Sequence, residues 1–165
     1  MTHQNSETPS QKESSNGKLG AGKFWQVFWL TFLVVSLGYA WYSFYTPSNR
    51  IVWADNYIIA QQQAFETEKP IILFFTGKWC SPCRIMKRQV WADDQVMSIV
   101  NAGFIPVIID VADTSAVQAL IQYRVHVTPT TIIINPKGIV LDKRLGGISK
   151  DEFLEMLESV KISEL

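Results

Sequence analysis

The feature that most constrains how this chain folds is a long uncharged stretch near its N-terminus. No residue between Phe24 and Asn49 is charged, and the apolar part of the stretch covers residues 24–45. As a helix these 22 residues would extend roughly 33 Å, enough to cross the hydrocarbon core of a bilayer. We therefore predict a single transmembrane helix that contacts the lipid bilayer through residues 24–45. Aromatic residues lie at both its ends, as in the interfacial belts of spanning helices: Phe24, Trp25 and Trp29, then Tyr39, Trp41, Tyr42 and Tyr45.

Two other interpretations of the apolar stretch remain open. A signal peptide would be cleaved near the small residues of Gly38-Tyr39-Ala40, although the apolar run continues in aromatic residues beyond them. A buried helix of a soluble core is the other interpretation, but such helices rarely run this long without a charge. An anchor and a signal peptide would both deliver the C-terminal part of the chain across the membrane.

Basic residues predict the orientation of the anchor. Lys12, Lys18 and Lys23 precede the apolar stretch, whereas only Arg50 follows it closely. Because basic residues stay on the cytoplasmic side, we expect a cytoplasmic N-terminus and a cell membrane crossed once. The rest of the chain would then be extracytoplasmic, which means periplasmic in a Gram-negative bacterium.

The chain is therefore expected to have four parts. The polar residues 1–23 predict a flexible tail, residues 24–45 the membrane helix, residues 46–52 a linker and residues 53–165 one globular domain. Over the whole chain, fifteen Lys and Arg balance fifteen Asp and Glu. Nucleic-acid binding normally needs a basic surplus, so we expect no nucleic-acid partner.

The C-terminal part alternates between expected strands and helices. Strands are predicted over residues 71–75, 104–111, 130–135 and 139–145, with the last two paired as a hairpin around the turn 136–138. Helices are predicted over residues 53–68, 80–90, 93–100 and 115–123, and after a capping box of Ser149 and Glu152. The inward-facing side chains are expected to be Ala54, Tyr57, Ile58, Ala64 and Phe65 in the first helix, and Phe153, Leu154, Leu157 and Val160 in the last. This order predicts an α/β fold with a mixed central sheet flanked by helices.

The strongest chemical signal is the motif Trp79-Cys80-Ser81-Pro82-Cys83, which follows a buried strand and opens a helix. At a helix N-terminus, unpaired backbone N–H groups and the macrodipole favour the thiolate of Cys80. Cys83 lies one turn deeper and can close a disulfide with Cys80. We therefore predict a redox-active Cys80–Cys83 pair as the catalytic residues, with Trp79, Ser81 and Pro82 as the active-site loop and no cofactor.

A two-cysteine motif can also serve a metal site, haem attachment or a structural disulfide. A zinc site needs four ligands, and the only histidines are His3 and His126, so no metal site is predicted. Haem attachment requires a histidine after the second cysteine, where this chain has Arg84. A purely structural disulfide remains an alternative, although so small a loop constrains the unfolded chain little.

A second motif, Thr128-Pro129-Thr130, lies just before the third predicted strand. Pro129 would suit a cis peptide close to the active-site loop, and an ordinary trans proline is the alternative. His126 is interpreted as a surface residue or a proton shuttle. Four cations near the cysteines would either stabilise a thiolate or form a solvated helix face: Lys78, Arg84, Lys87 and Arg88.

The cysteine motif and the Thr128-Pro129-Thr130 loop, together with Asn135-Pro136-Lys137-Gly138 and Gly146, resemble the thioredoxin family over residues 53–160. Lys69-Pro70 and residues 90–96 are similar to one branch, which includes the C-terminal domain of the membrane thiol:disulfide interchange protein DsbD and related anchored proteins. The resemblance implies a thioredoxin-like fold in which the first cysteine attacks. It also implies that Thr128 and Pro129 bind an extended substrate backbone.

Three positions depart from the family pattern. The buried aspartate that usually lies six residues before the first cysteine is replaced by Phe74, and the lysine that often pairs with it is replaced by Pro106. The two charges are absent together, so neither is left unpaired. Thr128 stands where reducing members often have isoleucine. The family's usual proton route for efficient turnover therefore lacks its two charged groups in this chain.

The expected function is a membrane-anchored thiol–disulfide oxidoreductase that exchanges disulfides with protein substrates. Reduction is the favoured direction, because Pro82 resembles the reducing members. A reductase outside the membrane would need electrons from a membrane thiol donor. The alternatives are a disulfide oxidase or isomerase, and a non-catalytic binding or chaperone module on the same fold.

Overall fold

A computed structural model describes residues 19–45 and 50–163 of the chain. Its contacts form two compact units, one ending at Tyr45 and one beginning at Thr46, and each unit is described by itself. The predicted tail lies outside the described residues up to position 18, as does the predicted linker over residues 46–49.

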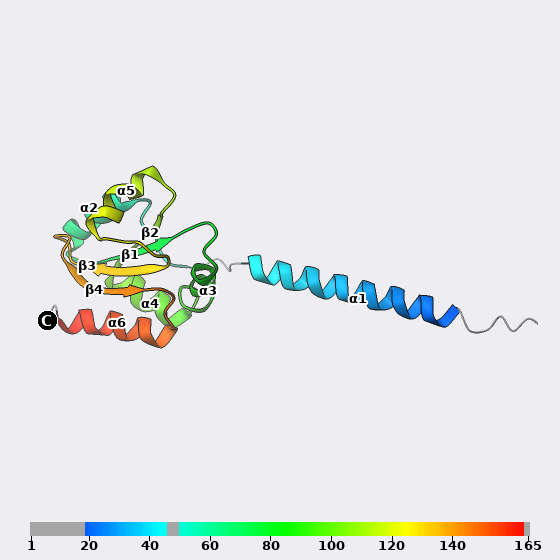
Figure 1. Ribbon diagram of the computed structural model, residues 1–165. Helices are drawn as coiled ribbons and strands as arrows, with labels where there is room; N and C mark the ends of the chain where they lie inside the picture. Colours follow the sequence, from blue (N-terminus) through cyan, green and yellow to red (C-terminus); the bar gives the residue numbers. More distant parts are fainter. Residues whose placement is uncertain (1–18, 46–49, 164–165) are drawn as a thin grey trace, which may run out of the picture. The chain divides into compact units, whose positions relative to one another are not determined.

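The described part of the first unit, residues 19–45, contains one helix, α1 (Leu19–Phe44), drawn in blue to cyan in Figure 1. It begins five residues before the predicted span, because the hydrogen-bonded backbone continues beyond the apolar side chains. Residues Lys23–Phe44 are long and apolar enough to cross a membrane, and none of that stretch is buried. A helix of a soluble core would be mostly buried, so this finding does not support the core-helix interpretation. The exposed aromatic side chains contact one another along the helix, as Trp25 does with Phe28 and Trp29.

The second unit is built on a four-stranded sheet in the order β2-β1-β3-β4 (Figure 1). The strands are β1 (Ile71–Thr76), β2 (Ile105–Asp110), β3 (Thr130–Ile134) and β4 (Val140–Leu145). β1 pairs with β2 in parallel and with β3 antiparallel, and β3 and β4 form the expected hairpin. The mixed central sheet is therefore confirmed. Gly138 supplies the positive φ of 82° that the hairpin turn requires.

Helices cover both faces of the sheet, as Figure 1 shows. On one face lie α2 (Tyr57–Thr67) and α5 (Val117–Gln122), which is preceded by a 3-10 turn, η1 (Thr114–Ala116). On the other face lie α3 (Ser81–Gln89), α4 (Asp94–Gly103) and α6 (Lys150–Ser163). The helix predicted over 115–123 is thus divided between η1 and α5. The capping box before α6 is confirmed, since Ser149 and Glu152 are mutually hydrogen-bonded.

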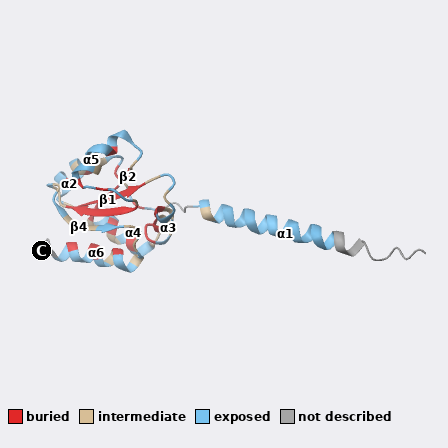
Figure 2. Ribbon diagram, in the orientation of Figure 1, coloured by how far each residue is buried: buried red, intermediate tan, exposed pale blue. Residues whose placement is uncertain are grey.

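The two sides of β1 supply two separate cores, because successive side chains of a strand point to opposite faces. Ile72 and Phe74 pack with α3, α4 and α6, whereas Leu73 and Phe75 pack with α2 and α5. All six residues of β1 are buried, which appears as a red strand in Figure 2.

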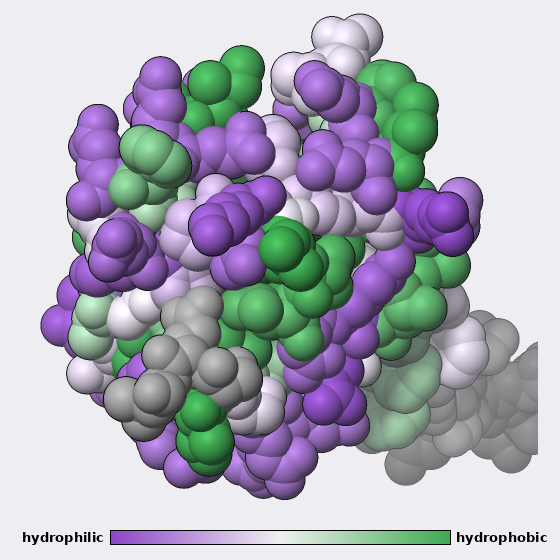
Figure 3. Space-filling model, turned by 90° about the vertical axis from the view of Figure 1, so that its left-hand side faces the viewer, coloured by the Kyte–Doolittle hydropathy of each residue, from purple (hydrophilic) through white to green (hydrophobic). Residues whose placement is uncertain are grey.

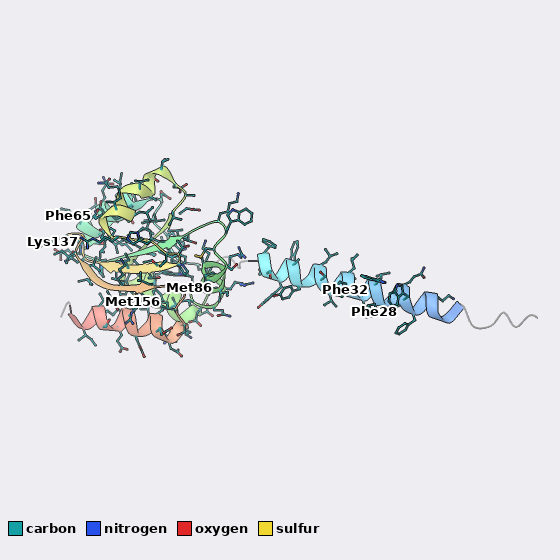
Figure 4. All side chains as sticks on the ribbon, viewed as in Figure 1. Phe28, Phe32, Phe65, Met86, Lys137 and Met156 are labelled. Atoms are coloured by element: carbon teal, nitrogen blue, oxygen red, sulfur yellow. A yellow bond between two sulfur atoms is a disulfide. The ribbon has the colours of Figure 1, made fainter. Side chains whose placement is uncertain are left out.

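An aromatic cluster around Trp91 forms the centre of the first core. The Trp91 ring is fully buried, and its centroid lies 4.8 Å from those of Trp53 and Phe153 and 5.2 Å from that of Phe74. Met86 of α3 and Met156 of α6, labelled in Figure 4, are buried in the same cluster. Met86 therefore lies on the buried side of α3.

The first helix of the domain differs from its prediction. It begins at Tyr57 after the N-cap Asn56, whose side chain accepts a hydrogen bond from the Ile59 N–H. Its buried residues are Ala60 and Ala64. Ile58 and Phe65 were expected to face inward but are 67% and 80% exposed. They lie one residue beyond the stripe that contains Tyr57 and Ala64, so a rotation of about 100° carries them off the sheet.

The segment before that helix is extended. Trp53 packs on Trp91, and Ala54 forms a parallel bridge with Val107 at the edge of β2. Just upstream, Ile51 is buried, and the carbonyl of Arg50 accepts a hydrogen bond from the Asn101 side chain on α4. The described end of the predicted linker is thus fixed against α4.

Candidate active site

The cysteine motif occupies the turn between β1 and α3. The Cys80 N–H donates to the Gly77 carbonyl at 3.1 Å, which closes a turn directly after the strand. Cys80 is the N-cap of α3 and Pro82 lies in the first turn of the helix, where a missing N–H costs nothing. This local sequence therefore begins a helix at the point where the two sulfur atoms are needed.

The two cysteines form a disulfide, with Cα atoms 5.2 Å apart. They differ in environment, because Cys83 is only 1% exposed whereas Cys80 is half-buried. The Cys83 N–H points at Cys80 Sγ at a distance of 3.2 Å. A backbone donor and the helix dipole both stabilise negative charge at that sulfur. In the dithiol form, Cys80 would therefore be the more accessible and more acidic thiol.

The Thr128–Pro129 loop lies beside the cysteine turn. Its peptide bond is cis, so the trans alternative was wrong. The Gly146 N–H donates to the Pro129 carbonyl at 2.8 Å, and a β-carbon on Gly77 would lie 4.0 Å from Thr128 Oγ1. A β-carbon on Gly147 would lie 3.6 Å from the Pro82 Cβ. Three segments distant in sequence thus meet around the two sulfurs.

The surface around the sulfurs is partly apolar. Trp79 is 83% exposed, and Ile85 and Val127 are also exposed. Ser81 and Pro82 are exposed, and the Ser81 hydroxyl lies 3.1 Å from the Arg84 guanidinium, which donates to it. Thr128 is half-buried, so part of its side chain reaches the surface next to the motif. A partner segment lying here would meet these apolar side chains.

The structure also places the other residues that the sequence singled out. Phe74 occupies the core position beneath the cysteines and is fully buried against Trp91. Pro106 lies two residues from the position opposite Phe74, which is Ile108. His126 is exposed in the loop before Thr128. In the part of the chain that the structure describes, no three His, Cys, Asp or Glu side chains are grouped as metal ligands.

A small pocket of about 230 Å³ adjoins Cys83. Its lining includes three of the four cations noted in the sequence, Lys78, Arg84 and Lys87, and also Thr76 and Asp110. Sequence reasoning missed these last two residues. They end the neighbouring strands β1 and β2 and are paired in the sheet register. Parallel pairing of the two predicted strands would have placed Thr76 and Asp110 next to each other.

A second hollow of about 600 Å³ lies at the end of α2, lined by Phe65, Glu68 and residues 135–137. Figure 4 shows Phe65 and Lys137 at the opposite end of the domain from Met86 of α3. The surface on that side is a mosaic of hydrophilic and hydrophobic residues, as Figure 3 shows. This hollow is therefore separate from the disulfide.

Comparisons with known proteins agree with this geometry. A family model described as a thioredoxin-like domain matches residues 59–161. Thioredoxin H5 of Arabidopsis thaliana is 32% identical over 97 residues, which cover 58% of this chain and 75% of that protein. The resemblance to the thioredoxin family, and the fold that it implies, are confirmed.

Proteins of the DsbD branch are among those similar to this chain. The thiol:disulfide interchange protein DsbD of Campylobacter jejuni is 24% identical over 107 residues, which cover 64% of this chain but only 19% of that protein. The crystal structure of the oxidised C-terminal domain of Neisseria meningitidis DsbD superposes with a TM-score of 0.54. That alignment is 22% identical and covers 64% of this chain and 96% of the domain.

Proposed function

The chain belongs to the thioredoxin-like domain family, and we propose that it is a membrane-anchored protein-disulfide reductase. As a member of this family it is a thiol–disulfide oxidoreductase with a Cys80–Cys83 pair. The proposal adds the direction of electron flow, the residue roles and the location. The observation that carries it is the placement of Cys80 at the N-terminus of α3, with Cys83 buried within bonding distance and the cis-Pro129 loop alongside.

The proposed reaction has two exchange steps. The Cys80 thiolate attacks one sulfur of a substrate disulfide, forms a mixed disulfide and releases the other substrate sulfur as a thiolate. Cys83 then loses its proton and attacks Cys80 Sγ, which releases the second substrate thiolate and forms the Cys80–Cys83 disulfide. Two electrons pass from the cysteine pair to the substrate. The order follows from exposure, because a protein substrate reaches Cys80 before the buried Cys83.

We assign substrate binding to the surface beside the disulfide. Thr128 and Pro129 would hold an extended substrate segment, and the exposed ring of Trp79 would contact its apolar side chains. Ser81 and Pro82 shape the loop between the two sulfurs. Protein disulfides are the proposed substrates.

The proposed location rests on α1 and on the basic residues before it. The 22-residue stretch Lys23–Phe44, apolar enough to cross a membrane and with no buried part, fits a single span. Lys12, Lys18 and Lys23 favour a cytoplasmic N-terminus. The oxidised pair would then be reduced again by an integral membrane thiol protein, because an extracytoplasmic domain has no access to cytoplasmic reductants. The division into tail, span, linker and domain belongs to the same proposal.

A disulfide-reduction assay with the full chain in non-ionic detergent tests the activity. We expect catalysed reduction of insulin with dithiothreitol as electron source, and a trapped mixed disulfide with Cys83→Ala. The matched control, Cys80→Ala, should trap none. An intact protein without turnover or trapping would instead indicate a binding or chaperone module.

One observation favours a disulfide oxidase or isomerase as the second candidate. Lys78, Arg84 and Lys87 line the pocket beside Cys83, and cations that stabilise a thiolate make a disulfide more oxidising. The reduction potential separates the candidates, since about −270 mV is typical of a reductase and roughly −120 to −180 mV of an oxidase or isomerase. The potential can be measured by equilibration with glutathione.

Labelling in intact cells tests the location. A membrane-impermeant maleimide should modify reduced Cys80 from outside, and labelling only after lysis would contradict an extracytoplasmic domain. The mass of the mature protein distinguishes a retained anchor from a cleaved signal peptide.

A further inference from the structure

A buried thiol that must lose a proton needs a group to receive it. Cys83 is buried, and its surroundings in the core are apolar, with Phe74 and Met86 in the same cluster. Within residues 50–163, no Asp or Glu side chain is buried. The part of the domain that the structure describes therefore holds no buried carboxylate that could accept the Cys83 proton.

The pocket beside Cys83 offers another path. At about 230 Å³ it has room for several water molecules, each of which occupies about 30 Å³ in the liquid. Thr76 Oγ1 is buried at this pocket and has no hydrogen-bond partner among the described residues. A buried hydroxyl group is normally hydrogen-bonded, and water in the pocket would satisfy it. The site is thus polar as well as large enough for water.

Asp110 supplies a carboxylate to the same pocket. It ends β2 directly opposite Thr76 in the sheet and is only partly buried, so solvent can reach it. Its Oδ1 accepts a hydrogen bond from the Ala112 N–H at 3.0 Å, which holds the side chain at the end of the strand. A carboxylate can accept further hydrogen bonds at both oxygens. Asp110 therefore connects the pocket to the outside.

We propose that Asp110 accepts the proton of Cys83 through water in this pocket and so replaces the buried carboxylate whose usual position is occupied by Phe74. The inference rests on the proposed function and deepens its second step. The Cys83 S–H bond breaks and its proton passes through water to Asp110. The resulting thiolate attacks Cys80 Sγ, the mixed disulfide breaks, and the substrate sulfur leaves as a thiolate. Asp110 then releases the proton to solvent.

Charged side chains lie at both ends of this path. Lys78, Arg84 and Lys87 line the pocket and stabilise the developing thiolate. On its other side Asp110 borders a pocket that Asp55 and Asp113 also line. The three cations therefore assist the loss of the proton from Cys83.

Ellman's reagent separates the two exchange steps in a stopped-flow experiment. With the reduced full chain in non-ionic detergent, attack by Cys80 releases one coloured thiolate and attack by Cys83 releases a second. For Asp110→Asn we expect an unchanged first phase and a second phase slowed about 100-fold near neutral pH, the lower part of the range for general base catalysis. The difference should shrink above a pH of about 8.5, where hydroxide ionises a free thiol.

Three further variants serve as controls for Asp110→Asn. Asp113→Asn removes a nearby carboxylate that does not line the Cys83 pocket, so both phases should stay within about twofold of the unmodified protein. Asp110→Glu should restore most of the second phase. If Asp110→Asn does not fold, Asp110→Ser removes the carboxylate while keeping an acceptor for the Ala112 N–H.

The role of Asp110 and the proposed function can fail separately in this experiment. A second phase that Asp110→Asn or Asp110→Ser leaves within about twofold of the unmodified rate at every pH would overturn the role of Asp110 and leave the proposed function standing. Absence of both phases in the unmodified protein would refute the proposed function, and the inference with it.

Discussion

Replacing Phe74 with aspartate would put a carboxyl group where the resemblance to the thioredoxin family implies one, but in a core built without a partner for it. Phe74 is fully buried, and its ring centroid lies 5.2 Å from that of Trp91. The position paired with it on β2 is Ile108, which offers no charge or hydrogen bond. The variant therefore loses aromatic packing and gains an unsatisfied polar group.

The cost can be worked out from these two losses. Removing a buried phenylalanine ring destabilises a core by about 3–5 kcal/mol. Burying a polar group without a hydrogen bond adds about 1–3 kcal/mol. The expected loss of about 4–8 kcal/mol is comparable with the whole stability of a typical domain, about 5–15 kcal/mol. Phe74→Asp should therefore be largely unfolded or close to it.

Urea unfolding of the full chain in non-ionic detergent measures this loss. Near-ultraviolet circular dichroism follows it directly, because it reports the packing of Trp91 and its neighbours. The control Phe74→Leu keeps an apolar side chain and should cost about 1–2 kcal/mol. A free energy of unfolding for Phe74→Asp within about 1 kcal/mol of the unmodified protein would refute the account of this core.

Two further predictions concern the surface of the domain. The Lys150 ammonium, 2.9 Å from Asp93, lowers the pKa of that carboxyl group, as do hydrogen bonds from the first turn of α4. The stabilisation from Asp93 is therefore present above its unfolded pKa of about 3.9 and is lost as the pH falls through its lower folded value. Asp93→Ala should lower the free energy of unfolding by about 1 kcal/mol at neutral pH and by less in acid. Urea unfolding at both pH values measures the loss, and an equal loss at the two would contradict this prediction. Trp79 is 83% exposed, so Trp79→Ala should leave the melting temperature unchanged but raise the KM for a protein disulfide. An unchanged KM in the insulin assay would remove Trp79 from the proposed binding surface.

The cysteine pair could be predicted from sequence because its geometry is local. Four consecutive residues, Cys80 to Cys83, set the helix start and bring the two sulfurs within bonding distance. Pro129 depended on a resemblance as well, since the cis bond follows from the approach of a distant loop and not from the residues beside it. The structure confirms the pair and the cis bond, whereas the catalytic roles remain predictions.

The residues that sequence reasoning missed are those whose neighbours come from elsewhere in the chain. Asp110 and Thr76 meet only because β1 and β2 pair in one particular register. Likewise, the helix expected from residue 53 begins later because Trp53 packs on Trp91, which periodicity within a short window cannot reveal. Phe65 was wrongly predicted to face inward, because the sequence of α2 contains two overlapping apolar stripes.

The proposed chemistry depends on the N-terminus of α3 making Cys80 an acidic thiol, with Cys83 within bonding distance of it. Titration of thiolate absorbance in reduced Cys83→Ala measures the Cys80 thiol by itself. We predict that its pKa lies clearly below the value of about 8.5 for a free cysteine, because a backbone N–H and the helix dipole stabilise the anion. A midpoint at or above that value would contradict the account.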